Sequence, residues 1–214
     1  MKLTFAYDRG RDIWCVLNYG KTSMNSPTPT KVYGELVKEY GDNPSQNNAD
    51  SFVEAYINKN TINTDEITRS LQKNWDEISL EYQKRAEKIF GVGLPNDVTA
   101  YSTINDRCPY NIQDHMFYVS VAYLNAVNKT AMHELWHFYT WYKYGIEWEQ
   151  KIGTQKYNEI KEALTVLLNV ECEDLLPEGI VDKGYTQHQE LRQKILDLWS
   201  KDKDMDKLWQ ALVA

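Results

Sequence analysis

The segment from residue 133 to residue 137 reads His-Glu-Leu-Trp-His, and it carries the most specific chemistry in this chain of 214 residues. On a helix with 3.6 residues per turn, His133 and His137 lie one turn apart on the same face, so both imidazoles can bind one zinc ion. Glu134 lies beside them and can act as a general base. The spacing therefore predicts a catalytic zinc site.

The residues that flank this motif carry no charge. Thr130 and Ala131 precede it, and Phe138 and Tyr139 follow it. A helix that carries two buried metal ligands is expected to be apolar nearly all round, because the metal lies inside the domain. The flanks therefore favour a zinc site over a chance pattern or a pair of core histidines.

Composition excludes several other classes of function. The net charge of −7 and the pI near 5.2 argue against a nucleic-acid partner, since phosphate binding needs a basic surface. The N-terminal segment becomes polar at Asp8, so neither a signal peptide nor a membrane span is expected. Cys15, Cys108 and Cys172 are widely spaced, which fits neither a disulfide framework nor a cysteine zinc site. These features predict a cytoplasmic protein without a membrane partner.

The third metal ligand must come from elsewhere, because hydrolytic zinc sites usually have three protein ligands and an open fourth position. A metzincin would have Gly and His three and six residues after the second histidine, where this chain has Thr140 and Lys143. The remaining candidates are Glu159 and Glu162, and Glu162 is favoured because it lies deeper in an apolar run.

The elements that must position these residues can be read from periodicity and turn residues. Strands are expected at Leu3–Tyr7, Ile13–Asn18, Asp97–Ile104 and Met116–Tyr123. Helices are expected at Ala49–Asn58, from an N-cap at Thr64 to a stop at Gly91, from Asn128 or Thr130 to Gly145, at Tyr157–Leu176 before Pro177, at Thr186–Trp199 and at Lys203–Leu212. The motif and both candidate glutamates therefore fall on two consecutive helices.

The run Glu162-Ala163-Leu164-Thr165 resembles the Glu-Ala-x-Ser or Glu-Ala-x-Gly run around the zinc glutamate of thermolysin-like peptidases, the gluzincins. The order of a backing helix, strands, the motif helix and a glutamate helix also resembles their catalytic core, over residues 64–176. In one respect the chain departs from that family. Gluzincins often carry an Asp four residues after the zinc glutamate, where it accepts a hydrogen bond from a ligating histidine, and this position is Val166. Thr165 and Asn169 lie on about the same helix face and could substitute.

The resemblance implies an α+β, zincin-like fold, with a small mixed or antiparallel sheet packed against the motif helix and the glutamate helix, and a mostly helical C-terminal part. One domain over residues 1–214 is expected, with a catalytic core at 64–190 and an N-terminal elaboration at 1–63. The strand Met116–Tyr123 resembles the edge strand on which zincins bind an extended peptide.

The implied activity is hydrolysis of a peptide or protein substrate by a zinc metallopeptidase. His133, His137 and Glu162 bind Zn²⁺, and Glu134 takes a proton from the attacking water. Tyr185 or His188 is expected to stabilise the oxyanion, because gluzincins supply such a donor from beyond the glutamate helix. The alternative is a zincin-fold binding or structural protein with zinc but little turnover. The choice between endopeptidase and exopeptidase and the oligomeric state stay open.

Overall fold

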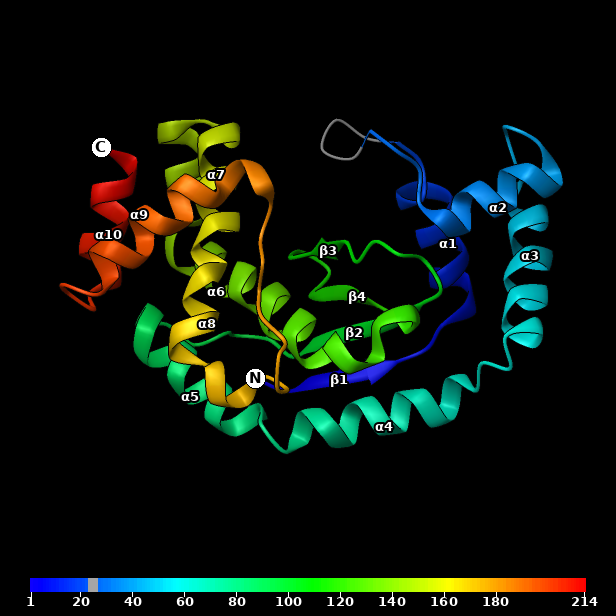
Figure 1. The fold of residues 1–214 in the computed structure, drawn as a ribbon, viewed down its shortest axis with the longest axis horizontal. Coiled ribbons are helices and arrows are strands. Elements are labelled where there is room, and N and C mark those ends of the chain that lie inside the picture. Colours follow the sequence, from blue (N-terminus) through cyan, green and yellow to red (C-terminus); the bar gives the residue numbers. More distant parts are fainter. Residues whose placement is uncertain (23–26) are drawn as a thin grey trace. The chain divides into compact units, whose positions relative to one another are not determined.

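The computed structural model describes residues 1–22 and 27–214, which form a mostly helical α+β protein with one small sheet (Figure 1). The strands are β1 (Leu3–Ala6), β2 (Val98–Thr103), β3 (Tyr110–Asn111) and β4 (Met116–Ser120). The helices are α1 (Arg9–Tyr19), α2 (Lys31–Tyr40), α3 (Gln46–Lys59), α4 (Thr64–Asp76), α5 (Ser79–Phe90), α6 (Val127–Ile152), α7 (Thr154–Leu164), α8 (Leu168–Glu171), α9 (Gln189–Trp199) and α10 (Met205–Val213). Short 3-10 turns lie at Val121–Ala126, Thr165–Leu167, Glu173–Leu175 and Thr186–His188.

The chain folds into two compact units whose segments alternate along the sequence. The sheet unit comprises residues 2–75 and 96–127, and the helical unit comprises residue 1 with 76–95 and 128–214. The N-terminal segment therefore belongs to the same unit as the strands of residues 96–127, and the chain first passes from the sheet unit to the helical unit between residues 75 and 76. A single domain over the whole chain stays a prediction.

The sheet unit is built on a four-stranded mixed sheet with the strand order β1-β2-β4-β3. β1, β2 and β4 run parallel, and β3 is antiparallel to β4. A mixed sheet was one of the two arrangements expected. β4 is an internal strand where Tyr110 and Asn111 of β3 pair with Phe117 and Met116, so the expectation of an edge strand there is wrong.

Residues 13–18 belong to helix α1, so the expected strand is wrong. Residues 13–17 are a continuous run of five apolar residues, and such a short run fits a buried strand as well as a helix. The helix is specified by Asp8, whose carboxylate accepts a hydrogen bond from the Arg11 amide and caps the first turn. Burial of Ile13 and Val16 in one core cluster then follows a helical spacing of three.

Two helices, α4 and α5, replace the single helix expected between Thr64 and Gly91. The break falls at residues 77–78, and Gly91 ends α5 in the left-handed conformation with φ 68°, as expected of a C-cap glycine. The N-cap lies one residue earlier than expected, since the Asn63 side chain accepts a hydrogen bond from the Glu66 amide.

The helical unit surrounds α6, which carries the His-Glu-Leu-Trp-His motif. Leu135, Trp136, Phe138 and Tyr139 have no exposed surface, in agreement with the expected all-round apolar helix. From α5, Phe90 packs edge-on against Trp136, with ring centroids 4.9 Å apart. Gly145 interrupts the helix with φ 35°, close to the expected end. α5 is therefore a backing helix for the motif.

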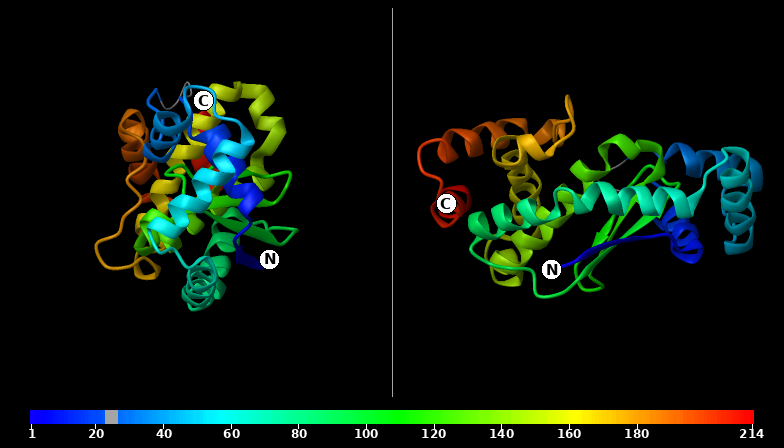
Figure 2. Two further views of the ribbon diagram at one scale, coloured as in Figure 1. Left: turned by 90° about the vertical axis from the view of Figure 1, so that its right-hand side faces the viewer. Right: turned by 90° about the horizontal axis from the view of Figure 1, so that it is seen from below.

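After α6 the chain continues as α7, a 3-10 turn and α8, and then crosses to α9 through an extended segment (Figure 2). The helical path ends at Leu175, in keeping with the stop expected before Pro177. Each helix in the part of the chain that the structure describes is too short or too polar to cross a membrane.

Candidate metal centre

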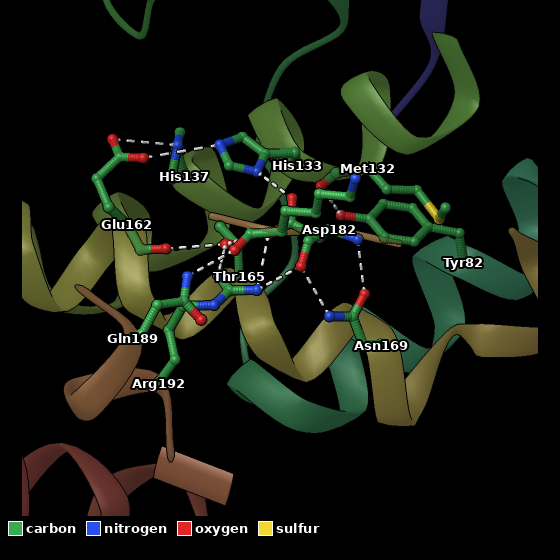
Figure 3. Close-up of polar contacts among 11 residues, drawn as sticks. Tyr82, Met132, His133, His137, Glu162, Thr165, Asn169, Asp182, Gln189 and Arg192 are labelled. Carbon is green, nitrogen blue, oxygen red and sulfur yellow. Dashed lines mark hydrogen bonds and ion pairs between the residues drawn. The ribbon is translucent and has the colours of Figure 1, made fainter. Parts of the chain in front are cut away.

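Three side chains of the helical unit converge on one point. His133 and His137 project from α6, and Glu162 projects towards them from α7 (Figure 3). Glu162 Oε1 lies 3.4 Å from His137 Nε2, and Glu162 Oε2 lies 3.7 Å from His133 Nε2. Two donors on one tetrahedral zinc lie roughly 3.4 Å apart, given metal–donor bonds of about 2.0–2.2 Å. The group could therefore hold a metal ion.

A fourth residue, Asp182, orients His133. Asp182 is 3 % exposed, and its Oδ2 accepts a hydrogen bond of 2.6 Å from His133 Nδ1 (Figure 3). An ionised carboxylate can only accept, so the ring proton belongs on Nδ1. Nε2 then faces Glu162, and once it is deprotonated its lone pair is available to a metal, which is the usual arrangement for a ligating histidine.

Asp182 is itself held by three neighbours. Asn169 forms two hydrogen bonds of 2.8 Å with the Asp182 backbone, one in each direction. The Thr165 hydroxyl lies 2.9 Å from Asp182 Oδ1, and the buried Arg192 guanidinium lies 3.1 Å from the same oxygen. The position of the Asp182 carboxylate is therefore set by residues from α8, α9 and the turn between α7 and α8.

The role usually given to an Asp four residues after the zinc glutamate is thus performed by a residue twenty positions after Glu162. Thr165 and Asn169 were expected to substitute for that carboxylate directly. Instead, both hold Asp182, and Asp182 contacts the imidazole. A hydroxyl or an amide leaves the imidazole proton less firmly placed than an ionised carboxylate does.

Burial and the neighbouring charges shift the pKa values of all three candidate ligands. Burial lowers the pKa of His133, but its hydrogen bonds with Asp182 and Glu162 outweigh burial and raise the pKa to about 10. Burial, together with the nearby Lys161 ammonium, lowers the pKa of His137 to about 3. Burial alone would raise the pKa of Glu162, yet the two histidines hold it far below its usual range. Metal binding must therefore release a proton from His133, because a ligating imidazole is neutral.

Glu134 lies between the two histidines in sequence and is buried, with only 7 % of its surface exposed. Burial raises the pKa of its carboxyl to about 7, and the charge on Glu162 adds to this effect. Among the described residues, no hydrogen-bond donor reaches its buried Oε2. A carboxylate with these properties can accept a proton near neutral pH.

Lys161 brings a cation to the centre that the motif does not predict. It is buried, and its Nζ lies 3.1 Å from Glu162 Oε1. A buried ammonium beside a carboxylate offsets the negative charge of Glu162 and can also donate hydrogen bonds.

Three other residues were predicted for the site, and none of them belongs to the group of His133, His137 and Glu162. Glu159 lies one turn before Glu162 and accepts a hydrogen bond from the Gln155 side chain, and it lies outside the group of three candidate ligands. Tyr185 and His188 come from the segment that leads into α9, with ring centroids 5.6 Å apart. Tyr185 is half exposed and His188 is buried. Their role at the metal stays a prediction.

Sequence reasoning missed Asp182, Arg192 and Lys161. Asp182 lies in a loop beyond Pro177, where no helical or strand period marks which side chains point inward. Arg192 and Lys161 stand in amphipathic helices, where a basic residue normally marks a solvated face. Comparison with protein-family models, curated proteins and solved structures finds no match for this chain.

Proposed function

We propose that this protein is a zinc-dependent metallopeptidase of the gluzincin type, in a zincin-like fold, and that it hydrolyses peptide bonds with Glu134 as general base. The observation that carries the proposal is the buried Glu134 carboxylate, next in sequence to His133 and within electrostatic reach of both His133 and Glu162. A structural metal site has no use for a base at this position.

The donor set supports zinc with an open position. Two imidazoles and one carboxylate are ligands of hydrolytic zinc, whereas structural zinc sites use four protein ligands, mostly cysteines. In residues 1–22 and 27–214, no further His, Cys, Asp or Glu joins the group of three. A zinc ion held by these three residues would have a fourth coordination position for water or substrate.

The residues of the centre have separate roles in the proposed hydrolysis. Zinc held by His133, His137 and Glu162 would supply a Lewis acid that activates water and polarises the scissile carbonyl. Glu134 takes a proton from the attacking water and later delivers it to the leaving amine, so that one water is consumed for each bond cleaved. Asp182 keeps the His133 proton on Nδ1 during this cycle.

The negative charge that develops on the substrate oxygen needs a donor besides the metal. Tyr185 and His188 are the candidates from the sequence, and the buried Lys161 is added by the geometry. Lys161→Met, Tyr185→Phe and His188→Leu each remove one donor with little change in volume. The donor is identified as the residue whose loss lowers kcat about 100-fold to 1000-fold.

The metal is tested by elemental analysis of the purified protein. Wild type is expected to contain one zinc per chain, and Glu162→Ala is expected to lose it. Glu159→Ala is the matched control, because it removes the same side chain from the same helix outside the group of three, and it should retain zinc. Zinc retained by Glu162→Ala, or iron in place of zinc, would overturn the proposed site.

Activity is tested on a diverse peptide library. Glu134→Gln should retain zinc and lose chelator-sensitive cleavage by about 100-fold to 10,000-fold, since it removes only the base. Zinc bound without any cleavage by wild type would favour the alternative, a zincin-fold protein used for binding or structure. Unchanged cleavage by Glu134→Gln would exclude Glu134 as the base.

A further inference from the structure

A cavity of about 550 Å³ lies in the sheet unit, between α1 and the segment that contains β3 and β4. Its size is that of a typical ligand pocket. Four aromatic side chains line it, namely Trp14, Tyr19, Tyr110 and Tyr118. All of the residues that line it belong to the sheet unit, and none of them is a residue of the metal centre.

Two of these aromatic residues are unusually exposed for their size. Trp14 is 49 % exposed and Tyr19 is 38 % exposed, and their ring centroids lie 5.5 Å apart. Trp14 also lies nearly parallel to the buried Tyr118 ring, at 6.4 Å and 17°. The cavity therefore presents aromatic faces, whose negative quadrupoles attract cations.

Two carboxylates, Asp8 and Asp114, also line this cavity. Asp8 accepts a hydrogen bond from the Arg11 amide, and Asp114 accepts one from the Asn111 side chain. Neither forms an ion pair with any residue that the structure describes. Their negative charges are hydrogen-bonded but not neutralised by a cation.

Two guanidinium groups lie near these carboxylates, and one of them, that of Arg11, lines the cavity itself. Arg9 forms ion pairs with Asp50 at 2.7 Å and with Glu54 at 2.9 Å. Arg11 lies with its Cζ atom 4.5 Å from the centre of the Tyr101 ring, and its Nη1 lies 2.9 Å from Met116 Sδ. The cavity thus combines aromatic walls with two carboxylates against the single charge of Arg11.

We propose that this cavity binds a basic side chain, lysine or arginine, of a peptide or an unstructured protein segment. The aromatic faces take the apolar stem and the charged head of that side chain, and Asp8 and Asp114 provide the opposite charge. The binding is independent of the metal and of peptide hydrolysis, so either proposal can fail without the other.

The test is calorimetric titration of the full chain with blocked pentapeptides that differ only in the central residue, arginine, norleucine or glutamate, between glycines. The arginine peptide is expected to bind at least tenfold more tightly than the norleucine peptide, with an affinity that falls as salt rises. Equal affinities, tighter binding of the glutamate peptide, or no binding of the arginine peptide up to about 5 mM would overturn the proposal.

Two variants test the named groups. Trp14→Ala should weaken binding of the arginine peptide about threefold to thirtyfold, and Tyr123→Ala, which removes an exposed aromatic residue outside the cavity, should not change it. Asp114→Asn should weaken binding of the arginine peptide while leaving the norleucine peptide unaffected. Asp65→Asn, at an exposed carboxylate of the same unit, is its control.

Thermal unfolding of each variant separates loss of binding from loss of folding. Asp114 is exposed in a loop, so its variant should fold as wild type does even if Trp14→Ala does not. Unchanged affinity of the arginine peptide for a folded Asp114→Asn would exclude Asp114 from the site. Unchanged affinity in both cavity variants would overturn the assignment of this cavity.

Discussion

Asp182 in the helical unit and Asp12 in the sheet unit are both almost completely buried, yet their protonation differs. Asp182 accepts hydrogen bonds from Thr165 and His133 and faces the Arg192 guanidinium. Asp12 accepts hydrogen bonds from the Thr103 hydroxyl at 2.6 Å and the Ile104 amide at 3.0 Å, and it faces no cation within ion-pair distance among the described residues.

The two pKa values move in opposite directions for this reason. Burial alone would raise the pKa of Asp182, but His133 and Arg192 hold it well below its usual range. Burial raises the pKa of Asp12 to about 6, because its polar contacts with Thr103, Ile104 and Tyr7 do not replace a counter-charge. Burial of a carboxylate therefore does not by itself identify a working centre. The buried cation partners distinguish Asp182, which stays ionised and can orient an imidazole.

Asp182→Asn should have the largest effect of the changes that break this contrast. The buried Arg192 charge loses its partner, which costs about 3–5 kcal/mol of the free energy of unfolding. If the new amide turns its nitrogen to His133, the imidazole proton must move to Nε2, the atom that faces Glu162. Metal affinity should therefore fall by about 10-fold to 100-fold or more.

Chemical denaturation and metal titration measure these two losses separately. Asp174→Asn is a control, because Asp174 is an exposed carboxylate of the same unit that pairs with Arg85 outside the metal centre. Its stability should change little, because an exposed ion pair contributes little, and it should keep its metal affinity. A folded Asp182→Asn with wild-type metal affinity would show that Asp182 does not orient His133.

Asp12→Asn should remove the loss of stability that wild type shows as the pH rises. The ordinary pKa of this carboxyl is 3.8 and the folded one is about 6, so the folded state binds the proton more tightly. Wild type therefore loses stability as pH rises through this window, by about 3 kcal/mol from this group. The stability of Asp12→Asn relative to wild type should accordingly increase by about 2 kcal/mol between pH 4 and pH 8, since part of this stabilisation is already lost at pH 4.

Unfolding free energies measured at a series of pH values test this expectation, with the exposed Asp65→Asn as the control that should show no such trend. A difference between Asp12→Asn and wild type that does not change with pH would mean that Asp12 is ionised throughout. In that case the contrast between the two buried aspartates would disappear.

Some residues of the site could be predicted from the sequence, and Asp182 could not. His133, Glu134 and His137 follow a local helical period, and the Glu162 context lies on the next helix, so these residues could be named without coordinates. Asp182 could not, because its inward direction comes from contacts with Thr165, Asn169 and Arg192 that are distant in sequence.

Secondary structure was predicted wrongly where two features of the sequence favour different elements. The continuous apolar run at residues 13–17 fits a short buried strand as well as a helix, and the cap formed by Asp8 favours the helix. Most helices were predicted, because their apolar periods are long enough to outweigh single residues. For the sheet, the choice between a mixed and an antiparallel arrangement was left open. The alternation of two compact units along the chain depends on parallel pairing between β1 and β2, about ninety residues apart, and no local pattern contains that information.

The smallest effects are expected from a matched pair of substitutions, Thr165→Val and Thr103→Val. Each removes a hydroxyl that serves a buried aspartate, and each should cost about 1 kcal/mol of the free energy of unfolding. Thr103 supports the ionised form of Asp12, so its loss should cost more at pH 8 than at pH 4.5, where Asp12 is protonated. Thr165 supports a carboxylate that is ionised at both pH values, so its cost should be equal at both. Only Thr165→Val should also weaken metal binding, by a few-fold, because Asp182 reaches the metal through His133. Denaturation at the two pH values measures the cost of each substitution, and metal titration of both variants measures the loss of metal affinity. If the cost depends on pH equally in the two variants, the cation partners do not cause the difference in pKa between Asp182 and Asp12.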